Sequence, residues 1–202
     1  MIQLNSPTEE DETRVIEANS LEDPLQLELL NNYSSLTYRD GSTATLKHFK
    51  AQNLSPVQFK WIMGLMERNM KKMYKRSQGG WKERKKRKEM TQETSRYLVA
   101  YVNEKPVAFT HFQFDMDYGR QVLYCYEIQL ETTVRRFGLG KHIMKTLEEI
   151  ATATKLSMVV LTVFKHNLNA LAFFKSIRYD IDETCPEDEE EKDYVIMSKR
   201  TL

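Results

Sequence analysis

The sequence predicts a mixed α/β domain, in which helices flank a mostly antiparallel central sheet and a helical arm precedes it. Three apolar segments separated by short polar turns predict an antiparallel meander over residues 96–102, 107–116 and 121–130. The third segment runs into a turn with two glycines and then into a helix from about residue 138, and an apolar strand follows at 158–163. Such a strand, helix and strand form a right-handed crossover, so we expect these two strands to be parallel.

The composition favours a single domain around one core. The chain has 202 residues, 41% of them hydrophobic, and a formal net charge of +1, which gives no overall bias towards nucleic acid or membranes. Cys125 and Cys185 are too few for a disulfide framework and have no metal-ligand spacing, so we expect a reducing compartment and no metal. Without a membrane-length apolar run or a secretory signal, the expected location is nucleus and cytoplasm.

The first part of the chain is expected to be peripheral. Residues 1–54 should form a helical arm and a first strand at 43–49, packed on a domain of residues 55–202. The arm should break at Asp23-Pro24, because the residue before a proline disfavours helix.

A long helix should open the domain. Ser55 supplies an N-cap, Pro56 suits the first helical position, and Gln58 completes a capping box. Spacings of three and four give this helix a buried face of Phe59, Ile62, Met66, Met70 and Met73.

A basic run from Lys82 to Lys88 should form a short helix. Such a run is most often a solvated face, and contact with a nucleosome or a ribosome surface is the alternative. Acidic runs at residues 9–12 and 187–191 balance it.

The turn from Arg135 to Lys141 is a candidate phosphate cradle. A helix N-terminus has unpaired backbone N–H groups, and glycines let a phosphate approach them. Two glycines are too few for the dinucleotide fingerprint, and His142 replaces the Ser or Thr of the triphosphate loop. The turn alone therefore fits a cradle or an ordinary strand-to-helix connection.

Two strings resemble the GNAT superfamily of acetyl-CoA-dependent N-acetyltransferases. Arg135-Arg136-Phe137-Gly138-Leu139-Gly140 is similar to its pyrophosphate loop, and residues 167–174 are similar to its Asn-x-x-Ala helix start. The resemblance implies the GNAT fold, acetyl-CoA as co-substrate, and a cleft for the pantetheine arm where the parallel strands splay apart. The cofactor-binding positions that it implies are Ile128, Gln129, Leu130, Arg135, Arg136, Gly138, Leu139, Gly140, Lys141, Asn167 and Phe174.

Within the superfamily, the chain resembles the NatD family over residues 55–200. The strings Tyr124-Cys125-Tyr126-Glu127 and Thr-Val-Phe-Lys-His-Asn at 162–167 are specific to it. The resemblance implies acetyl transfer to the α-amino group of the N-terminal serine of histones that begin Ser-Gly-Arg-Gly. One departure is Phe174, since many superfamily members have a tyrosine there that protonates the departing thiolate.

Glu127 is the candidate base. An α-amino group has a pKa near 7.7 to 8.0, so it needs modest help, which a carboxylate can give directly or through water if burial raises its pKa. Its alternative role is a salt bridge to a nearby Lys or Arg. Backbone N–H groups near Ile128 would polarise the thioester carbonyl, and Tyr124 and Tyr126 supply phenols. Strict alternation puts Glu127 on the face opposite Tyr126 unless a bulge intervenes.

The predicted peptide site lies on the substrate side of this base. Asp115 and Asp117 are expected to hold the arginine of the tail, although aspartate also simply suits a turn. The full set of expected substrate-binding residues is Tyr74, Trp81, Asp115, Asp117, Tyr126 and Tyr194.

Several alternatives stay open. Cys125 as an acyl carrier is disfavoured, because no histidine is placed to make a thiolate. A GNAT enzyme that acetylates lysine side chains or small amines is one rival. A noncatalytic chromatin-binding module that uses the basic run is another. We expect a monomer.

Overall fold

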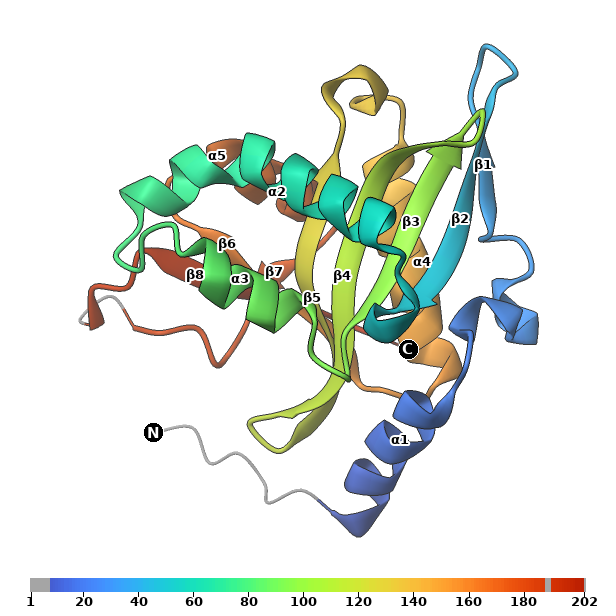
Figure 1. Cartoon of the computed structure of the whole chain (residues 1–202). Helices are drawn as coiled ribbons and strands as arrows, with labels where there is room; N and C mark the ends of the chain where they lie inside the picture. Colours follow the sequence, from blue (N-terminus) through green and yellow to red (C-terminus); the bar gives the residue numbers. More distant parts are fainter. Residues whose placement is uncertain (1–7, 188–189, 202) are drawn as a thin grey trace.

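A computed structural model describes residues 8–187 and 190–201, which form one eight-stranded sheet with helices on both faces (Figure 1). The strand order is β1-β2-β3-β4-β5-β6-β8-β7, and neighbours are antiparallel except for the parallel pair β5 and β6. This arrangement is the mixed, mostly antiparallel sheet that the sequence predicts.

The strands are β1 Ser35–Thr37, β2 Thr43–Lys50, β3 Arg96–Val102, β4 Lys105–Asp117, β5 Arg120–Leu130, β6 Met158–Phe164, β7 Asp180–Ile181 and β8 Tyr194–Arg200. The α-helices are α1 Glu9–Ser20, α2 Pro56–Arg76, α3 Glu83–Met90, α4 Leu139–Ala153 and α5 Leu168–Ser176. Short 3-10 turns lie at Pro24–Gln26, Glu28–Leu30, Ala51–Asn53 and Thr132–Val134.

The predicted elements of the domain are present, and the additional strands are very short. The meander β3-β4-β5 and the parallel pair have the expected order and direction. β1 and β7 were not expected, because three and two residues are too few to show an apolar pattern. Residues 188–189 of the acidic run lie outside the described residues.

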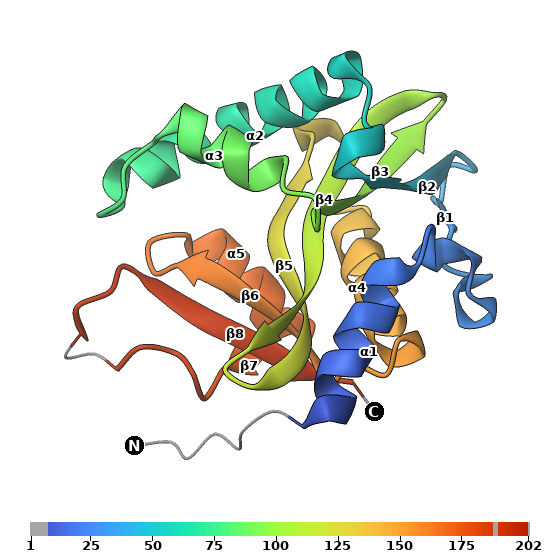
Figure 2. The ribbon, with the colours of Figure 1, turned by 60° about the horizontal axis from the view of Figure 1, so that its bottom comes forward.

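Helices cover the two faces of the sheet with separate cores. Figure 2 shows α2 and α3 on one side of β3, β4 and β5, and α4 with α1 on the other. The capping box between Ser55 and Gln58 is present at the start of α2. The buried face of α2 is Ile62, Met63, Leu65 and Met66. The predicted stripe was therefore partly wrong, because Phe59, Met70 and Met73 are only half-buried at its edges.

The arm packs onto the main core through a buried arginine. Arg96 is 2% exposed, and its guanidinium donates to the carbonyl oxygens of Asn19 and Leu21 at 2.7 Å each, at the end of α1. The amide of Asn19 in turn donates to the carbonyl oxygen of Phe114 at 3.0 Å. The carbonyl oxygens of Asn19 and Leu21 have no partner within α1, so Arg96 supplies the hydrogen bonds that a helix C-terminus lacks.

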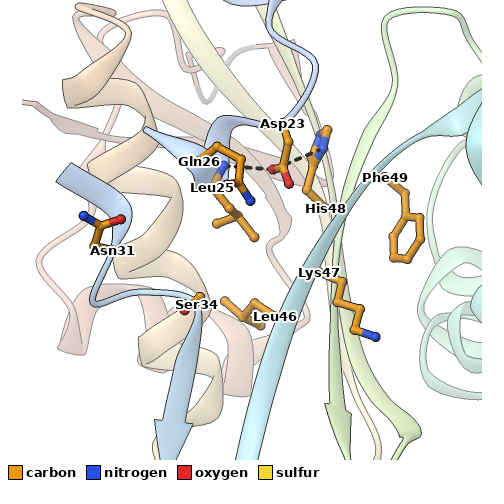
Figure 3. Close-up of a pocket in the computed structure, with 9 residues that line it drawn as sticks. All are labelled: Asp23, Leu25, Gln26, Asn31, Ser34, Leu46, Lys47, His48 and Phe49. Carbon is orange, nitrogen blue, oxygen red and sulfur yellow. Dashed lines mark hydrogen bonds and ion pairs between the residues drawn. The ribbon is translucent and has the colours of Figure 1, made fainter. Parts of the chain in front are cut away.

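A pocket of about 490 Å³ lies where the arm meets β2 (Figure 3). The side chain of Asp23 points at His48 there, with 3.6 Å between the carboxylate and Nδ1. Burial, with the charges of Arg96 and Lys50, lowers the pKa of His48 to about 3, so the ring is neutral. This pocket shares no lining residue with the larger groove described next.

Candidate active site

The parallel strands separate to form a groove. β5 and β6 pair only from Val122 with Met158 to Cys125 with Leu161. Beyond this point β6 continues beside β8 and turns away from β5 (Figure 2). The space between the strands is part of a groove of about 1140 Å³, and the edge of β5 that faces it has no strand partner. The lining includes residues 124–130 of β5, residues 161–164 of β6, the turn before α4, α5, and side chains from α2 and α3.

The turn before α4 presents free backbone donors to this groove. Gly138 is the N-cap with φ +90°, and no side chain of the described residues caps the helix. The first bond within the helix runs from the N–H of His142 to the carbonyl of Gly138 at 2.9 Å. The N–H groups of Leu139, Gly140 and Lys141 therefore lack helical partners and lie at the positive end of the helix dipole. A Cβ on Gly140 would lie 3.4 Å from the ring of Phe173, at ordinary contact distance.

Some predicted cofactor-binding residues use their side chains for hydrogen bonds within the protein. The guanidinium of Arg135 donates to the carbonyl of Leu130 at 2.9 and 3.1 Å and to Asn69 Oδ1 at 2.9 Å, which fixes the turn to β5 and α2. Asn167 Oδ1 accepts from the N–H of Ala170 at 3.3 Å and caps α5.

Two more of these residues are part of the hydrophobic core. Leu139 is fully buried, and Phe174 is 5% exposed, with its ring 5.8 Å from that of Tyr179. The backbone of the turn is thus better placed to hold a phosphate than most of its side chains. The contacts of these residues with coenzyme A remain predictions.

A β-bulge shapes the centre of β5. His111 of β4 pairs with Glu127, whereas the next residue, Phe112, pairs with Cys125. Tyr126 is therefore an extra residue without a partner across the strand. The bulge interrupts strict alternation, which was the condition for Tyr126 and Glu127 to share a face.

Both side chains point to the face covered by α2 and α3. The ring of Tyr126 stacks on His111 at 5.1 Å, and His111 stacks on Tyr97 at the same distance in the core beneath α2. Glu127 accepts a hydrogen bond from the hydroxyl of Tyr74 of α2 at 3.1 Å. The candidate base and its neighbouring phenol therefore lie together in the groove.

Glu127 has three hydrogen-bond donors and is 6% exposed. Lys86 Nζ lies 2.9 Å from Oε1, next to the Tyr74 hydroxyl, and Gln129 Nε2 donates to Oε2 at 2.9 Å. A carboxylate has about four acceptor positions, so one stays available on Oε2. The alternative role of Glu127 as an ion-pair partner is thus real, and it coexists with a position in the groove.

Lys86 is the residue that sequence reasoning missed. It was counted with the solvated basic run, yet it is 8% exposed and reaches from α3 into the groove. Its Nζ also lies 2.6 Å from Glu89 and 5.2 Å from the ring centre of Tyr74. Burial opposes the charge, but Glu127, Tyr74 and Glu89 together raise the pKa of Lys86, which stays protonated. The available signal was Met90, because residues four apart share a helix face and Met90 is the buried apolar residue of α3.

The two phenols of the site keep their protons. Burial raises the pKa of Tyr124 and of Tyr126 to about 12. The hydroxyl of Tyr124 lies 2.6 Å from Thr162 Oγ1 across the splayed strands. Gln113 pairs with Tyr124, so alternation along β4 puts Asp115, two residues further on, on the same side of the sheet as the two phenols.

The two aspartates expected at the peptide mouth differ. Asp117 pairs with Arg120 at 3.1 Å, and Arg120 also holds Asp182 at 3.0 Å. Asp115 is exposed and accepts only from the neighbouring N–H of Met116, at 2.8 Å, among the bonds of the described residues. Asp117 therefore serves the hairpin, and Asp115 is the carboxylate open to a ligand.

The expected aromatic walls lie beside the base. The ring of Tyr74 is 5.6 Å from Trp81 and 5.0 Å from Phe164. Tyr194 begins β8 and pairs with Phe164. Tyr74 and Phe164 line the groove, whereas Trp81 and Tyr194 adjoin them without being among its lining residues.

Cys125 is among the lining residues of the groove, but its thiol is not available for the chemistry there. It is buried in the main core, its Sγ lies 3.5 Å from Thr110 Oγ1, and burial raises the pKa of the thiol to about 12. A thiol in this state is a poor nucleophile, which disfavours an acyl-cysteine intermediate.

A profile of the acetyltransferase (GNAT) family matches residues 63–178. The chain belongs to this family. The GNAT domain of an acetyltransferase from S. lividans, called PAT, is similar in structure, with a TM-score of 0.62 and 10% identity over 84% of this chain and 97% of that one. At this identity the likeness supports the fold alone.

Two further solved structures are also similar to this GNAT chain. Ard1 from Thermoplasma volcanium has a TM-score of 0.57 and 17% identity, over 79% of this chain and 98% of that one. Naa50 from Arabidopsis thaliana, in complex with the bisubstrate analogue CoA-Ac-MVNAL, has a TM-score of 0.53 and 15% identity, over 76% and 97%.

Two further observations on this GNAT chain concern metal ligands and membrane-spanning helices. Within residues 8–187 and 190–201, no three His, Cys, Asp or Glu side chains gather as ligands for a metal ion. In the same residues, none of the helices combines the length and hydropathy needed to cross a bilayer.

Proposed function

We propose that this acetyltransferase transfers the acetyl group of acetyl-CoA to the α-amino group of the N-terminal serine of histones that begin Ser-Gly-Arg-Gly, as the NatD family does. The observation that carries the proposal is the bulge at Tyr126, which puts Tyr126 and Glu127 on one face, in the groove that also contains the start of α4. A proton acceptor and an anion site then share one cavity.

The residues present fit acetyl-CoA. Three free N–H groups, of residues 139–141, would hold the pyrophosphate, and the gap between β5 and β6 has room for the pantetheine arm. The unpaired edge of β5 near Ile128 would bond that arm and polarise the acetyl carbonyl. The similar Naa50 structure, which holds a coenzyme A conjugate, supports this placement.

Glu127 would act on the amine directly, within a ternary complex. An α-amino group is appreciably neutral near pH 7.5, so the carboxylate needs only to take the proton that leaves as the new amide bond forms. Phe174 has no proton for the departing thiolate, and it is buried in the core. Tyr124 and Tyr126 are protonated and line the groove, so we assign the donor role to this pair.

The walls of the groove favour a substrate that enters by its chain end over one that enters as an internal loop. The N–H of Gln78 donates to Asp193 at 2.6 Å and its side chain to the carbonyl of Glu191 at 2.8 Å, so the α2–α3 connection is tied to the segment before β8. His166 Nε2 lies 3.0 Å from the carbonyl oxygen of Met73, which joins α2 to the loop after β6. These bridges support entry of a free N-terminus.

The partners follow from the same proposal. Asp115 would hold the arginine of the histone tail by charge-assisted bonds, beside the walls formed by Tyr74, Trp81 and Tyr194. Lys82, Arg84, Lys85, Arg87 and Lys88 are exposed on α3 and would meet the nucleosome or ribosome surface. We propose that the enzyme works as a monomer in nucleus and cytoplasm.

A peptide panel tests the proposal. Release of coenzyme A is measured with a free Ser-Gly-Arg-Gly peptide that contains a lysine, and with the same peptide acetylated beforehand at its α-amino group. We expect turnover with the first peptide alone. Turnover with the blocked peptide would instead identify a lysine acetyltransferase, and nucleosome binding without any turnover would identify a binding module.

A further inference from the structure

The mechanism above gives no role to Lys86, a buried charge in the groove. Lys86 is buried, comes from α3 and lies 2.9 Å from the carboxylate that we assign as the base. A buried ion pair is costly to form, because both charges lose water. Its position at the base therefore asks for a reason beyond the stability of the fold.

The groups that face Lys86 leave Glu127 as its closest buried anion. Glu89 of α3 is the second carboxylate, and its side chain is 28% exposed. Tyr74 of α2 and Tyr97 of β3 are buried phenols whose pKa values burial raises, so both are neutral. His111 of β4 is neutral as well, because burial lowers its pKa to about 3. The arriving amine thus meets a paired carboxylate rather than a lone one.

We propose that Lys86 is a positioning residue, which neutralises the field of Glu127 so that the bound substrate amine loses its proton instead of being held as an ammonium ion. The inference rests on the proposed function and deepens it, since it concerns the kind of amine that the same site accepts.

The size of the effect follows from distance. An amine that bonds the free position of Glu127 lies about 6 Å from Nζ of Lys86, if each contact has an ordinary length near 3 Å. Two unit charges at about 6 Å, with an effective dielectric constant of about 20, change an ammonium-to-amine ratio by roughly a hundredfold. Lys86 therefore offsets much of the attraction that Glu127 exerts on a cation.

This device favours weakly basic amines. At pH 7.5 roughly a third of an α-amino group with a pKa near 7.8 is neutral, against about one part in 800 of a lysine side chain. In a site that does not stabilise the ammonium form, the rate depends on the neutral fraction of each amine, and these two fractions differ about 250-fold. Lys86 would then select α-amines by charge, in addition to any selection by shape.

The test compares Lys86→Met with Lys86→Arg. The single-turnover rate at saturating Ser-Gly-Arg-Gly peptide is measured from pH 6 to 9. In Lys86→Met the unpaired carboxylate should retain a proton, either its own or that of the bound ammonium ion, so the acid limb of the rate should move up by about one to two pH units. Lys86→Arg keeps the charge and should keep the wild-type midpoint. An unchanged midpoint in a folded Lys86→Met variant would overturn the proposal.

A second measurement uses the wild-type enzyme and does not depend on the fold of a variant. With coenzyme A bound, the affinity of the peptide is compared at pH 6.5 and 8.5 with that of an analogue that has a hydroxyl in place of the α-amino group. The amine should bind no more tightly at pH 6.5, where it is mostly ammonium, than at pH 8.5. Tighter binding at pH 6.5, with no change for the analogue, would contradict the role of Lys86.

The failure of the proposed substrate is distinguishable from the failure of this inference. A wild-type enzyme that ignores the peptide contradicts the histone proposal. The midpoint comparison between Lys86→Met and Lys86→Arg is then made with the amine that the enzyme does acetylate.

Discussion

The two halves of the groove are built by different means. The half beside α4 consists of backbone N–H groups from three consecutive residues, 139–141, at a helix start that no side chain caps. The half beneath α2 and α3 consists of side chains, among them Tyr74, Lys86 and Glu127, which three separate elements supply. The first half can bind the pyrophosphate, which is the same in every reaction, through its shape and the helix dipole. The function of the second half depends on charged side chains, each of which changes the pKa of its neighbours. Changes in the first half should therefore affect affinity for coenzyme A, and changes in the second should affect turnover and substrate choice.

The largest effect should come from Glu127→Gln, which keeps the size of the side chain but cannot accept a proton. We expect turnover to fall about a hundredfold or more, with little change in coenzyme A affinity by calorimetry. Glu89→Gln is the matched control, because it removes the other carboxylate beside Lys86 and leaves the base. If Glu127→Gln kept most of its activity across pH 6 to 9, Glu127 would be a structural ion-pair partner.

Gly138→Val should weaken coenzyme A binding at the half of the groove beside α4. Gly138 has φ +90°, a conformation that a β-branched residue adopts only with strain, so valine should shift the backbone of the turn and with it the N–H donors. Affinity for coenzyme A should fall by roughly five- to thirtyfold, which corresponds to about 1 to 2 kcal/mol. Gly41→Val is the control, since Gly41 has φ +84° with no atom within 4 Å of an added Cβ and is not among the groove's lining residues. Equal affinities in wild type and Gly138→Val would remove the phosphate-cradle assignment.

The hydrogen bonds to Asp182 predict an acid-sensitive contribution to stability. Burial raises the pKa of this carboxyl, but hydrogen bonds from Arg120, Ser198 and Thr184 outweigh burial and lower the pKa to about 2. A carboxyl whose pKa is lower in the folded state stabilises the fold above its unfolded value near 4, and this contribution disappears as the pH falls from about 4 to about 2. Asp182→Asn should lose about 1 to 2 kcal/mol of unfolding free energy at pH 7 and much less at pH 2.5. Denaturant titrations at both pH values measure the difference, and an equal loss at both would contradict the linkage.

The smallest effect should distinguish the two aspartates of β4. Asp115→Ala should raise KM for a Ser-Gly-Arg-Gly peptide several-fold, by about 1 kcal/mol for an exposed charged contact, and should matter much less for Ser-Gly-Ala-Gly. Asp117→Asn should instead loosen Arg120 and lower stability, with little change in KM. Equal losses on both peptides in Asp115→Ala would mean that this carboxylate does not contact the arginine.

The contrast between the two halves also explains what the sequence could predict. Gly138 and the strand before it are neighbours in the chain, so a local pattern was enough to locate the turn and the parallel crossover. The bulge at Tyr126 depends on pairing with β4, which no local pattern encodes. Lys86 looked like part of a solvated run, because its burial arises only when α3 packs over β5. Asp117 pairs with Arg120 only three residues away, whereas the contact of Arg120 with Asp182 joins distant parts of the chain and is not visible in a local pattern.

The central claim is that the charged half of the groove acts on a free α-amino group. The most direct test is fragmentation mass spectrometry of a peptide that begins Ser-Gly-Arg-Gly and contains an internal lysine, after incubation with the enzyme and acetyl-CoA. Our account predicts one acetyl group, on the N-terminal serine nitrogen, in the wild type and in Glu89→Gln, and a strongly reduced yield in Glu127→Gln. Acetylation of the internal lysine with the serine nitrogen left free would contradict it.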